Sequence, residues 1–195
     1  MNVAVIKYNA GNIRSVSFAL ERLNINFSIT DAPEEISAAD KVIFPGVGEA
    51  STTMKYLHDR KLDQIITNLK QPVLGICLGM QLMCRHSEEN DTKCLGIFDE
   101  TVKLFKPTLE MKVPHMGWNQ LKSTSGWLDL SLENQNAYFV HSYYVPVNKS
   151  TVAETEYLNP FSAAMQKDNF YAVQFHPEKS AEVGEKVLKC FLNQS

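Results

Sequence analysis

The first half of the chain alternates short apolar runs with segments whose apolar residues recur every three or four positions. Apolar runs of strand length occupy residues 3–8, 27–30, 42–44 and 73–76. Amphipathic helices are predicted between them, around Ile13, Val16, Leu20 and Leu23, around Met54 and Leu57, over residues 62–69, and from residue 78 through Met83. This alternation predicts parallel strands with helical crossovers, which bind ligands at the carboxyl ends of the strands.

A different pattern follows residue 87. Residues 88–93 form a charged run that we expect to be a solvated loop. Extended segments are predicted at 95–105 and 119–122, then strands at 137–145, 151–157, 162–166 and 170–175, and a closing helix with Val183, Val187, Leu188 and Phe191 inside. The sequence therefore predicts an α/β fold with a flavodoxin-like, doubly wound, mostly parallel sheet and antiparallel additions in the second half. We expect one domain over residues 1–195.

Composition narrows the class of protein. The chain has 195 residues, 44% of them hydrophobic, which is enough for one substantial core. Its formal net charge is −3 and no basic cluster stands out, which argues against a nucleic-acid or membrane partner. The apolar runs are too short to span a membrane and the first residues begin a strand, so we expect a cytoplasmic protein. No metal or cofactor is expected, because the cysteines lack zinc-site or disulfide spacing: Cys77, Cys84, Cys94 and Cys190.

The segment Gly75-Ile76-Cys77-Leu78-Gly79 places a cysteine between two glycines where an apolar strand must turn into a helix. Such a turn holds its central side chain exposed over the carboxyl end of the sheet, and a Cβ at either glycine would collide with neighbouring backbone. The pattern alone does not distinguish a nucleophile from a packing cysteine.

A candidate base for this thiol lies about a hundred positions further on. The strand predicted at 170–175 runs into His176-Pro177-Glu178. Residues two apart in extended chain face the same side, so Glu178 can hold the His176 ring in one tautomer. A third element, Pro45-Gly46-Val47-Gly48, follows another strand, and its glycines would let backbone N–H groups form an oxyanion hole.

These three segments, in this order, resemble class I (triad) glutamine amidotransferases. Two further segments, Pro114-His115-Met116-Gly117-Trp118-Asn119 and Tyr138-Phe139-Val140-His141-Ser142-Tyr143, are similar to those of the glutaminase subunits of imidazole glycerol phosphate synthases. The similarity spans essentially the whole chain. One departure is Lys7, which stands where the family is commonly acidic.

The resemblance implies hydrolysis of L-glutamine to glutamate and ammonia through a cysteine thioester. Cys77 would be the nucleophile, His176 the acid and base, and Glu178 the residue that orients His176. The oxyanion would be held by backbone amides of Leu78 and of the Gly46–Val47 region. Substrate-binding residues are expected at Gln81, His141, Ser142 and Tyr143, with His141 structural or substrate-lining rather than catalytic.

The resemblance also implies a separate cyclase subunit, a (β/α)8 barrel that forms a heterodimer with this chain and receives the ammonia for histidine biosynthesis. Candidate interface residues are Asn12, Met116, Trp118 and Tyr138. The glycines of residues 45–48 suggest that partner binding turns an amide of this loop into the oxyanion hole.

Three other functions remain open on the sequence. The chain could feed ammonia to another acceptor subunit, although residues 114–119 argue against that. It could be a free-standing hydrolase of γ-glutamyl or peptide bonds, which should be fully active alone. It could also be a non-catalytic binding subunit, although the intact Cys77, His176 and Glu178 speak against this.

Overall fold

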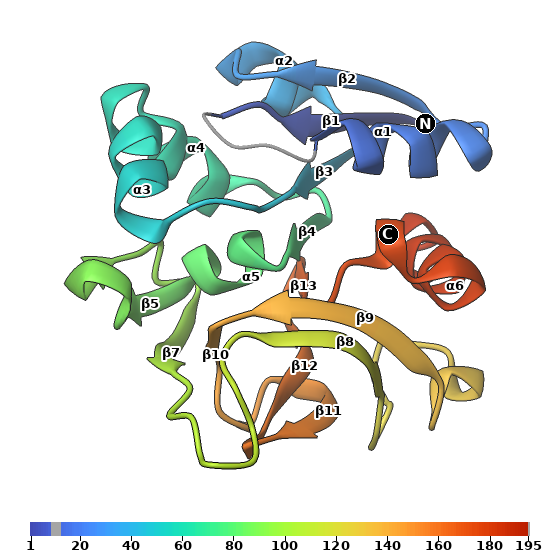
Figure 1. The fold of residues 1–195 in the computed structure, drawn as a ribbon. Coiled ribbons are helices and arrows are strands. Elements are labelled where there is room, and N and C mark those ends of the chain that lie inside the picture. The colour runs from blue at the N-terminus through green and yellow to red at the C-terminus, as the bar shows by residue number, and fades with distance from the viewer. Residues whose placement is uncertain (9–12, 195) are drawn as a thin grey trace.

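The fold is built on one seven-stranded sheet (Figure 1). The computed structural model describes residues 1–8 and 13–194. Five strands are parallel, in the spatial order β2-β1-β3-β4-β13, which is the flavodoxin-like order with β13 as the fifth strand. Two antiparallel strands, β12 and β11, extend the sheet beyond β13. The bounds are β1 Asn2–Ile6, β2 Asn26–Thr30, β3 Lys41–Phe44, β4 Val73–Ile76, β11 Thr151–Tyr157, β12 Asn159–Lys167 and β13 Phe170–Val173.

Helices cover both faces of this sheet, as Figure 1 shows. Alternate residues of β1 enter two different cores: Val3 and Val5 pack with α1 and α6, whereas Ala4 and Ile6 pack with α2, α3, α4 and α5. The period-2 alternation of a buried strand thus makes the sheet doubly wound. The helices are α1 Ile13–Arg22, α2 Pro33–Ala38, α3 Ala50–Asp59, α4 Leu62–Asn68, α5 Leu78–Met83 and α6 Ala181–Leu192.

The second half adds two smaller sheets. A four-stranded sheet has the order β10-β7-β5-β6, and a two-stranded sheet pairs β8 with β9. The predicted fold class is therefore confirmed, antiparallel additions included. Their bounds are β5 Cys84–Ser87, β6 Thr92–Lys93, β7 Phe98–Leu104, β8 His115–Gln120, β9 Asn136–His141 and β10 Tyr143–Tyr144.

Several local predictions need correction. The charged run 88–93 is not a simple loop, since it contains a 3-10 helix, η1 Glu89–Asp91, and strand β6. Its carboxylates explain the order, because Glu88 accepts the N–H of Leu104 and Glu89 that of Ala50, at 2.7 and 2.8 Å. The predicted strand 137–145 is two strands, because β9 pairs with β8 whereas β10 pairs with β7.

Two further elements escaped the sequence pattern. Helix α2 was not predicted, and it begins with Pro33, a residue suited to a first helical turn. Residues 115–118, expected between extended segments, themselves lie in β8. Among the described residues, no helix is both long and apolar enough to cross a membrane.

Candidate active site

Cys77 occupies a strained turn between β4 and α5. Its φ of 52° and ψ of −106° are unusual for a residue with a side chain, and its N–H donates to the carbonyl of Val173 at 2.8 Å. A Cβ added at Gly79 would lie 2.0 Å from the Phe44 carbonyl oxygen, and one at Gly75 would lie 2.9 Å from backbone atoms of α5. The predicted steric need for both glycines is confirmed.

Adjacent strands bring His176 and Glu178 to this turn. Strand β13 runs parallel to β4 with Val173 opposite Ile76, so the residues after both strands emerge at the same edge of the sheet. His176 Nδ1 lies 2.8 Å from Glu178 Oε1, and the two side chains are only 1% and 2% exposed. A carboxylate can accept but not donate, so Nδ1 carries the proton and Nε2 is left for proton exchange.

The charge of the His176 ring depends on its neighbours. Burial opposes the imidazolium, but the Cys77 sulfur and then the Glu178 carboxylate outweigh burial and raise the pKa of His176 to about 10. Nε2 is buried and has no hydrogen-bond partner of good geometry within the described parts of the chain. The arrangement thus favours the imidazolium form of His176 beside the Cys77 sulfur, with Nε2 left for proton exchange.

The loop 45–48 packs directly on the turn that carries Cys77. A Cβ at Gly46 would lie 2.4 Å from the nitrogen of Gly79, so Gly46 permits the close approach. The Tyr8 hydroxyl donates to the Pro45 carbonyl at 2.5 Å. Tyr8 is thus a loop-positioning residue that the sequence did not single out.

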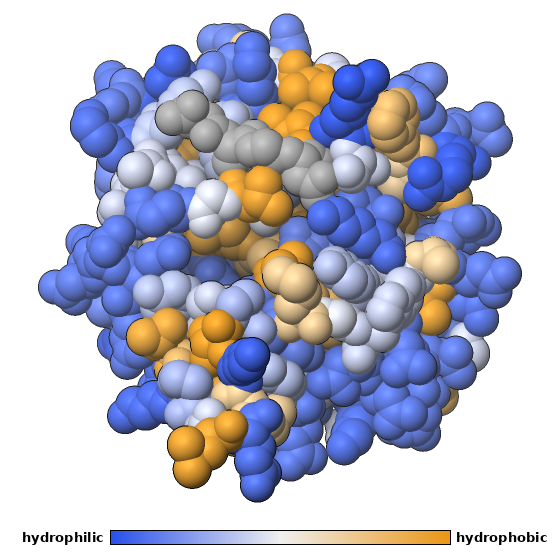
Figure 2. All heavy atoms as spheres, viewed as in Figure 1, coloured by the Kyte–Doolittle hydropathy of each residue, from blue (hydrophilic) through white to orange (hydrophobic). Residues whose placement is uncertain are grey.

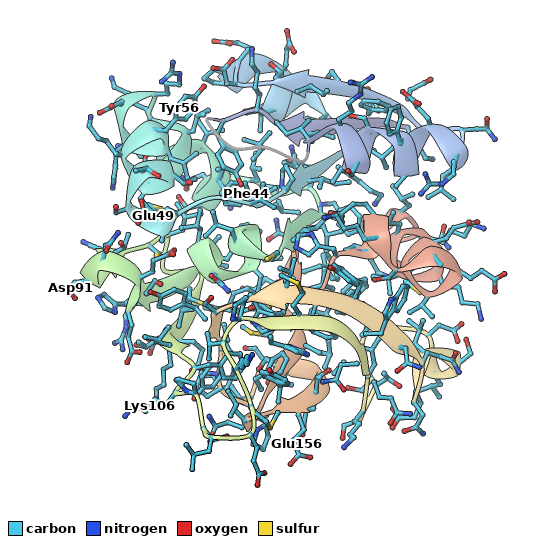
Figure 3. The ribbon with its side chains drawn as sticks, in the orientation of Figure 1. Phe44, Glu49, Tyr56, Asp91, Lys106 and Glu156 are labelled. Atoms are coloured by element: carbon cyan, nitrogen blue, oxygen red, sulfur yellow. The ribbon has the colours of Figure 1, made fainter. Side chains whose placement is uncertain are left out.

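The far end of the loop is fixed by a carboxylate. Glu49, labelled in Figure 3, caps α3 by accepting the N–H groups of Ser51 and Thr52 and also accepts from Asn90 Nδ2 at 2.8 Å. Burial opposes its charge, but these hydrogen bonds lower the pKa of Glu49 to about 2. The loop is therefore tied at one end to the segment after β1 and at the other to η1.

A cavity of about 290 Å³ opens between this loop, the nucleophile turn and the segment after β9. Most of the predicted substrate and oxyanion residues line it, whereas Gly46 and the candidate base His176 do not. The lining residues are Val47, Gly48, Cys77, Leu78, Gln81, Glu89, Val140, His141, Ser142 and Tyr143.

Comparison with known proteins agrees with this geometry. The model of the family "Glutamine amidotransferase class-I" matches residues 4–194. The chain belongs to this family. It is therefore a glutamine amidotransferase, an enzyme, as the three motifs predicted.

Relatives with curated descriptions are similar over their whole lengths. The chain is 61% identical to the imidazole glycerol phosphate synthase subunit HisH of Bacteroides fragilis, over 98% of this chain and 99% of that protein. It is 43% identical to the HisH subunit of Vibrio parahaemolyticus, over 97% of each chain. The resemblance to the imidazole glycerol phosphate synthase glutaminases, as predicted from residues 114–119 and 138–143, is confirmed.

Solved structures with more distant sequences share the fold. A crystal structure of a glutamine amidotransferase superposes with a TM-score of 0.75 at 17% identity, covering 97% of this chain and 96% of that one. A glutamine amidotransferase from Thermotoga maritima superposes with a TM-score of 0.64 at 16% identity, covering 98% of this chain and 82% of that one. At these identities the matches concern the amidotransferase fold alone.

Glu89 lines the cavity of the amidotransferase but was not predicted there. Its carboxylate accepts the N–H of Ala50, and this hydrogen bond holds η1 beside the cavity. Burial, which outweighs that hydrogen bond, raises the pKa of Glu89. The sequence contained the carboxylate in the charged run 88–93, but no spacing connected it with Cys77.

The candidate interface residues lie on the pair β8 and β9. Met116 and Trp118 are 63% and 56% exposed, and the Trp118 ring meets the ring of Tyr138 edge-on, with centroids 5.9 Å apart. The Tyr138 carbonyl accepts the N–H of His176 at 2.9 Å, so this surface lies against the candidate base. Figure 2 shows several separate hydrophobic groups among hydrophilic ones on the face that it presents. Asn12 lies outside the described residues.

Within the described residues, no group of His, Cys, Asp and Glu has the arrangement of a metal site.

Proposed function

We propose that this chain is the glutaminase subunit of an imidazole glycerol phosphate synthase, with residues 1–195 acting as one amidotransferase domain. The observation that carries the proposal is the buried His176–Glu178 pair behind the strained Cys77, at a cavity that fits a small amino acid. The full-length similarity to HisH subunits supports the choice among amidotransferases.

The Cys77 thiolate attacks the side-chain amide carbon of L-glutamine. When the tetrahedral intermediate collapses, the carbon–nitrogen bond breaks, the His176 imidazolium gives its proton to the departing nitrogen, and ammonia and a thioester result. Water then attacks the thioester and gives a proton to His176. The carbon–sulfur bond breaks, which releases glutamate and restores the thiolate. Glu178 keeps the ring oriented through both steps.

Two backbone amides are assigned to the oxyanion. Leu78 N–H follows the nucleophile, and the second donor comes from the Gly46–Val47 region. The Tyr8 hydroxyl, which donates to the Pro45 carbonyl, restrains the start of this loop. Release of that bond would let partner binding turn an amide of the loop into the hole.

The head of the substrate is assigned to the opposite end of the cavity. Gln81 and the segment 141–143 line it, as does the Glu89 carboxylate. An α-ammonium group needs an anionic or carbonyl partner. Glu89 contributes a carboxylate to the lining of the cavity. We therefore assign Glu89 to the ammonium of glutamine, and Gln81, His141, Ser142 and Tyr143 to the rest of the head.

Ammonia released into open water would be protonated and lost, so the activity makes physical sense only beside an acceptor. We assign that role to a (β/α)8-barrel cyclase subunit, docked in a cytoplasmic heterodimer on the surface that carries Met116, Trp118 and Tyr138. Large aromatic side chains are common anchors of such interfaces.

Co-purification with a candidate cyclase tests the proposal, followed by glutamate release with and without the cyclase's ribulosyl substrate. We expect a complex, little release by the chain alone, and strong stimulation when the ligand is bound. Full activity of the isolated chain would favour the free-standing hydrolase. Stimulation only by an acceptor subunit of another pathway would favour another amidotransferase.

A further inference from the structure

A buried chain of hydrogen bonds ends on the sulfur of Cys77. Gln174 Nε2 lies 3.6 Å from Cys77 Sγ, and Gln174 Oε1 accepts from Gln81 Nε2 at 3.0 Å. Gln81 Nε2 also donates to the backbone carbonyl of Tyr143 at 2.9 Å. Gln174 is fully buried, and Gln81 is 5% exposed. A buried amide of this kind needs partners for both of its ends, and here it finds them.

The carbonyl of Tyr143 sets the direction of this chain, because a carbonyl oxygen can only accept. Gln81 must therefore point its NH₂ group at Tyr143, and the second hydrogen of the same group reaches Gln174 Oε1. Gln174 then has its own NH₂ group on the side of Cys77. Cys77 Sγ thus faces a donor whose orientation is set by Gln81 and the Tyr143 carbonyl.

One histidine also contacts the same carbonyl, and a second histidine contacts the first. His141 Nδ1 lies 2.7 Å from the Tyr143 carbonyl oxygen, so Nδ1 carries the proton and Nε2 can accept. His115 Nδ1 lies 3.0 Å from that Nε2 and donates to it. His115 Nε2 in turn accepts from Asn119 Nδ2 at 3.3 Å.

Both rings are uncharged at neutral pH, which agrees with these tautomers. Burial lowers the pKa of His141 to about 3 and that of His115 to about 4. As a consequence, each hydrogen bond from Asn119 to Cys77 Sγ has one defined donor and one defined acceptor.

We propose that Gln174 stabilises the thiolate of Cys77 by donating an N–H to its sulfur, and that Gln81 and His141 are positioning residues that orient this donor through the Tyr143 carbonyl. The inference rests on the proposed role of Cys77. A donor favours the thiolate over the thiol because hydrogen bonds to an ionised acceptor are stronger. The Val140 carbonyl, 3.9 Å from Cys77 Sγ, is a weak acceptor for the thiol.

The test is the pH dependence of alkylation of Cys77 by iodoacetamide, in the full chain without glutamine, with the modified peptide identified by mass spectrometry. Gln174→Met keeps the length of the side chain but removes its donor. We expect the pH midpoint of alkylation to rise by about one unit and the rate at pH 7 to fall about tenfold, the effect of one hydrogen bond to a charged group. Gln64→Met, an exposed position on α4, is the matched control and should leave both unchanged.

A second variant keeps the inference testable if Gln174→Met does not fold, as judged by circular dichroism and thermal unfolding. Gln81→Met leaves Gln174 in place but removes its orientation, so the midpoint should rise by a smaller amount. A substrate-binding role alone would not move it, since no glutamine is present. A folded variant at either position with the wild-type midpoint would overturn the inference.

The result is separable from the proposed function. If Cys77→Ala abolishes glutamate release by the complex while Gln174→Met alkylates as the wild type does, only the role of Gln174 is lost. If Cys77→Ala leaves glutamate release intact, the proposed function itself fails.

Discussion

The backbone N–H of Cys77 donates to the carbonyl of Val173 at 2.8 Å, three residues before His176. This bond continues the pairing of β4 with β13 one step past the last strand residue of β4. The strained turn that carries Cys77 and the segment that carries His176 are therefore held by the same ladder of backbone hydrogen bonds. Neither can shift along the sheet without the other, which explains how residues so distant in the chain keep a common geometry.

Cys77→Ala should abolish glutamate release by the complex, by more than about a thousandfold, because no other group can form the thioester. The fold should survive, since Ala fits the same space. Activity of the complex with added ammonium salt should remain. Cys190→Ala, at a partly exposed cysteine of α6, is the control and should retain glutamine-dependent activity. Glutamine-dependent synthesis by Cys77→Ala would revive the idea of a non-catalytic subunit.

Glu178→Gln should move the alkaline limit of glutamate release to lower pH. In the wild type, burial opposes the charge on His176, but Cys77 and Glu178 raise the pKa of His176 from 6.5 to about 10. The imidazolium that protonates the departing ammonia thus persists up to about pH 10 and is lost above it. Without the carboxylate the pKa of His176 falls, so the proton donor is lost earlier.

The measurement is the rate of glutamate release by the complex across the alkaline range. Glu182→Gln, at an exposed position in the first turn of α6, is the control for the loss of one charge. An alkaline limit that stays at the wild-type pH in Glu178→Gln would contradict the assigned role of this carboxylate.

Gly184→Ala should destabilise the protein although alanine is the better helix former. A Cβ at Gly184 would lie 1.8 Å from the Pro177 carbonyl oxygen, so α6 or the segment 177–179 must move. We expect a loss of about 2 kcal/mol in the free energy of unfolding, measured with urea, together with reduced glutamate release because the pair His176–Glu178 shifts. Lys186→Ala, on the exposed side of α6, should be neutral or slightly stabilising. Equal free energies of unfolding for the two variants would contradict the prediction, because they would show that the backbone around residue 184 accommodates a Cβ without cost.

Tyr8→Phe should raise glutamate release by the isolated chain about fivefold, the effect of one net hydrogen bond of about 1 kcal/mol. The substitution removes only the hydroxyl that donates to the Pro45 carbonyl. The loop 45–48 then turns an amide toward the cavity more easily. Tyr56→Phe removes a hydroxyl that bonds Asp31 instead and should leave release unchanged. A decrease in Tyr8→Phe would mean that the hydroxyl supports the active form of the loop.

Trp118→Ala should weaken binding of the cyclase by about 2 kcal/mol, measured by titration calorimetry, without changing thermal unfolding of the isolated chain. Its side chain is 56% exposed and packs edge-on against Tyr138, so little of the core depends on it. Leu130→Ala, at an exposed residue outside β8 and β9, is the control. Unchanged affinity in Trp118→Ala would move the interface away from this surface.

Local sequence patterns were enough to predict the parts of the site that depend on steric limits and on the spacing of residues along the chain. The glycines around Cys77 predicted the nucleophile turn because their Cβ positions are already occupied by backbone within a few residues and by Phe44. His176 and Glu178 were predicted to pair from extended-chain geometry, and the pair is present. The reason was wrong, because Pro177–Lys179 form a 3-10 helix, η3, and its turn brings Glu178 Oε1 to His176 Nδ1. The parallel strands were found because buried strands have apolar runs of characteristic length.

The class of fold, the family and the three residues proposed for catalysis could be inferred before any coordinates were known, since each depends on short-range backbone geometry or on a motif. Only the tertiary structure brought Tyr8 to the loop 45–48, Glu89 to the cavity, and Gln174 between Gln81 and the sulfur. Periodicity tells which face of a strand is buried but not which strand lies beside it. Contacts across neighbouring strands therefore become visible only when the order of the sheet is known.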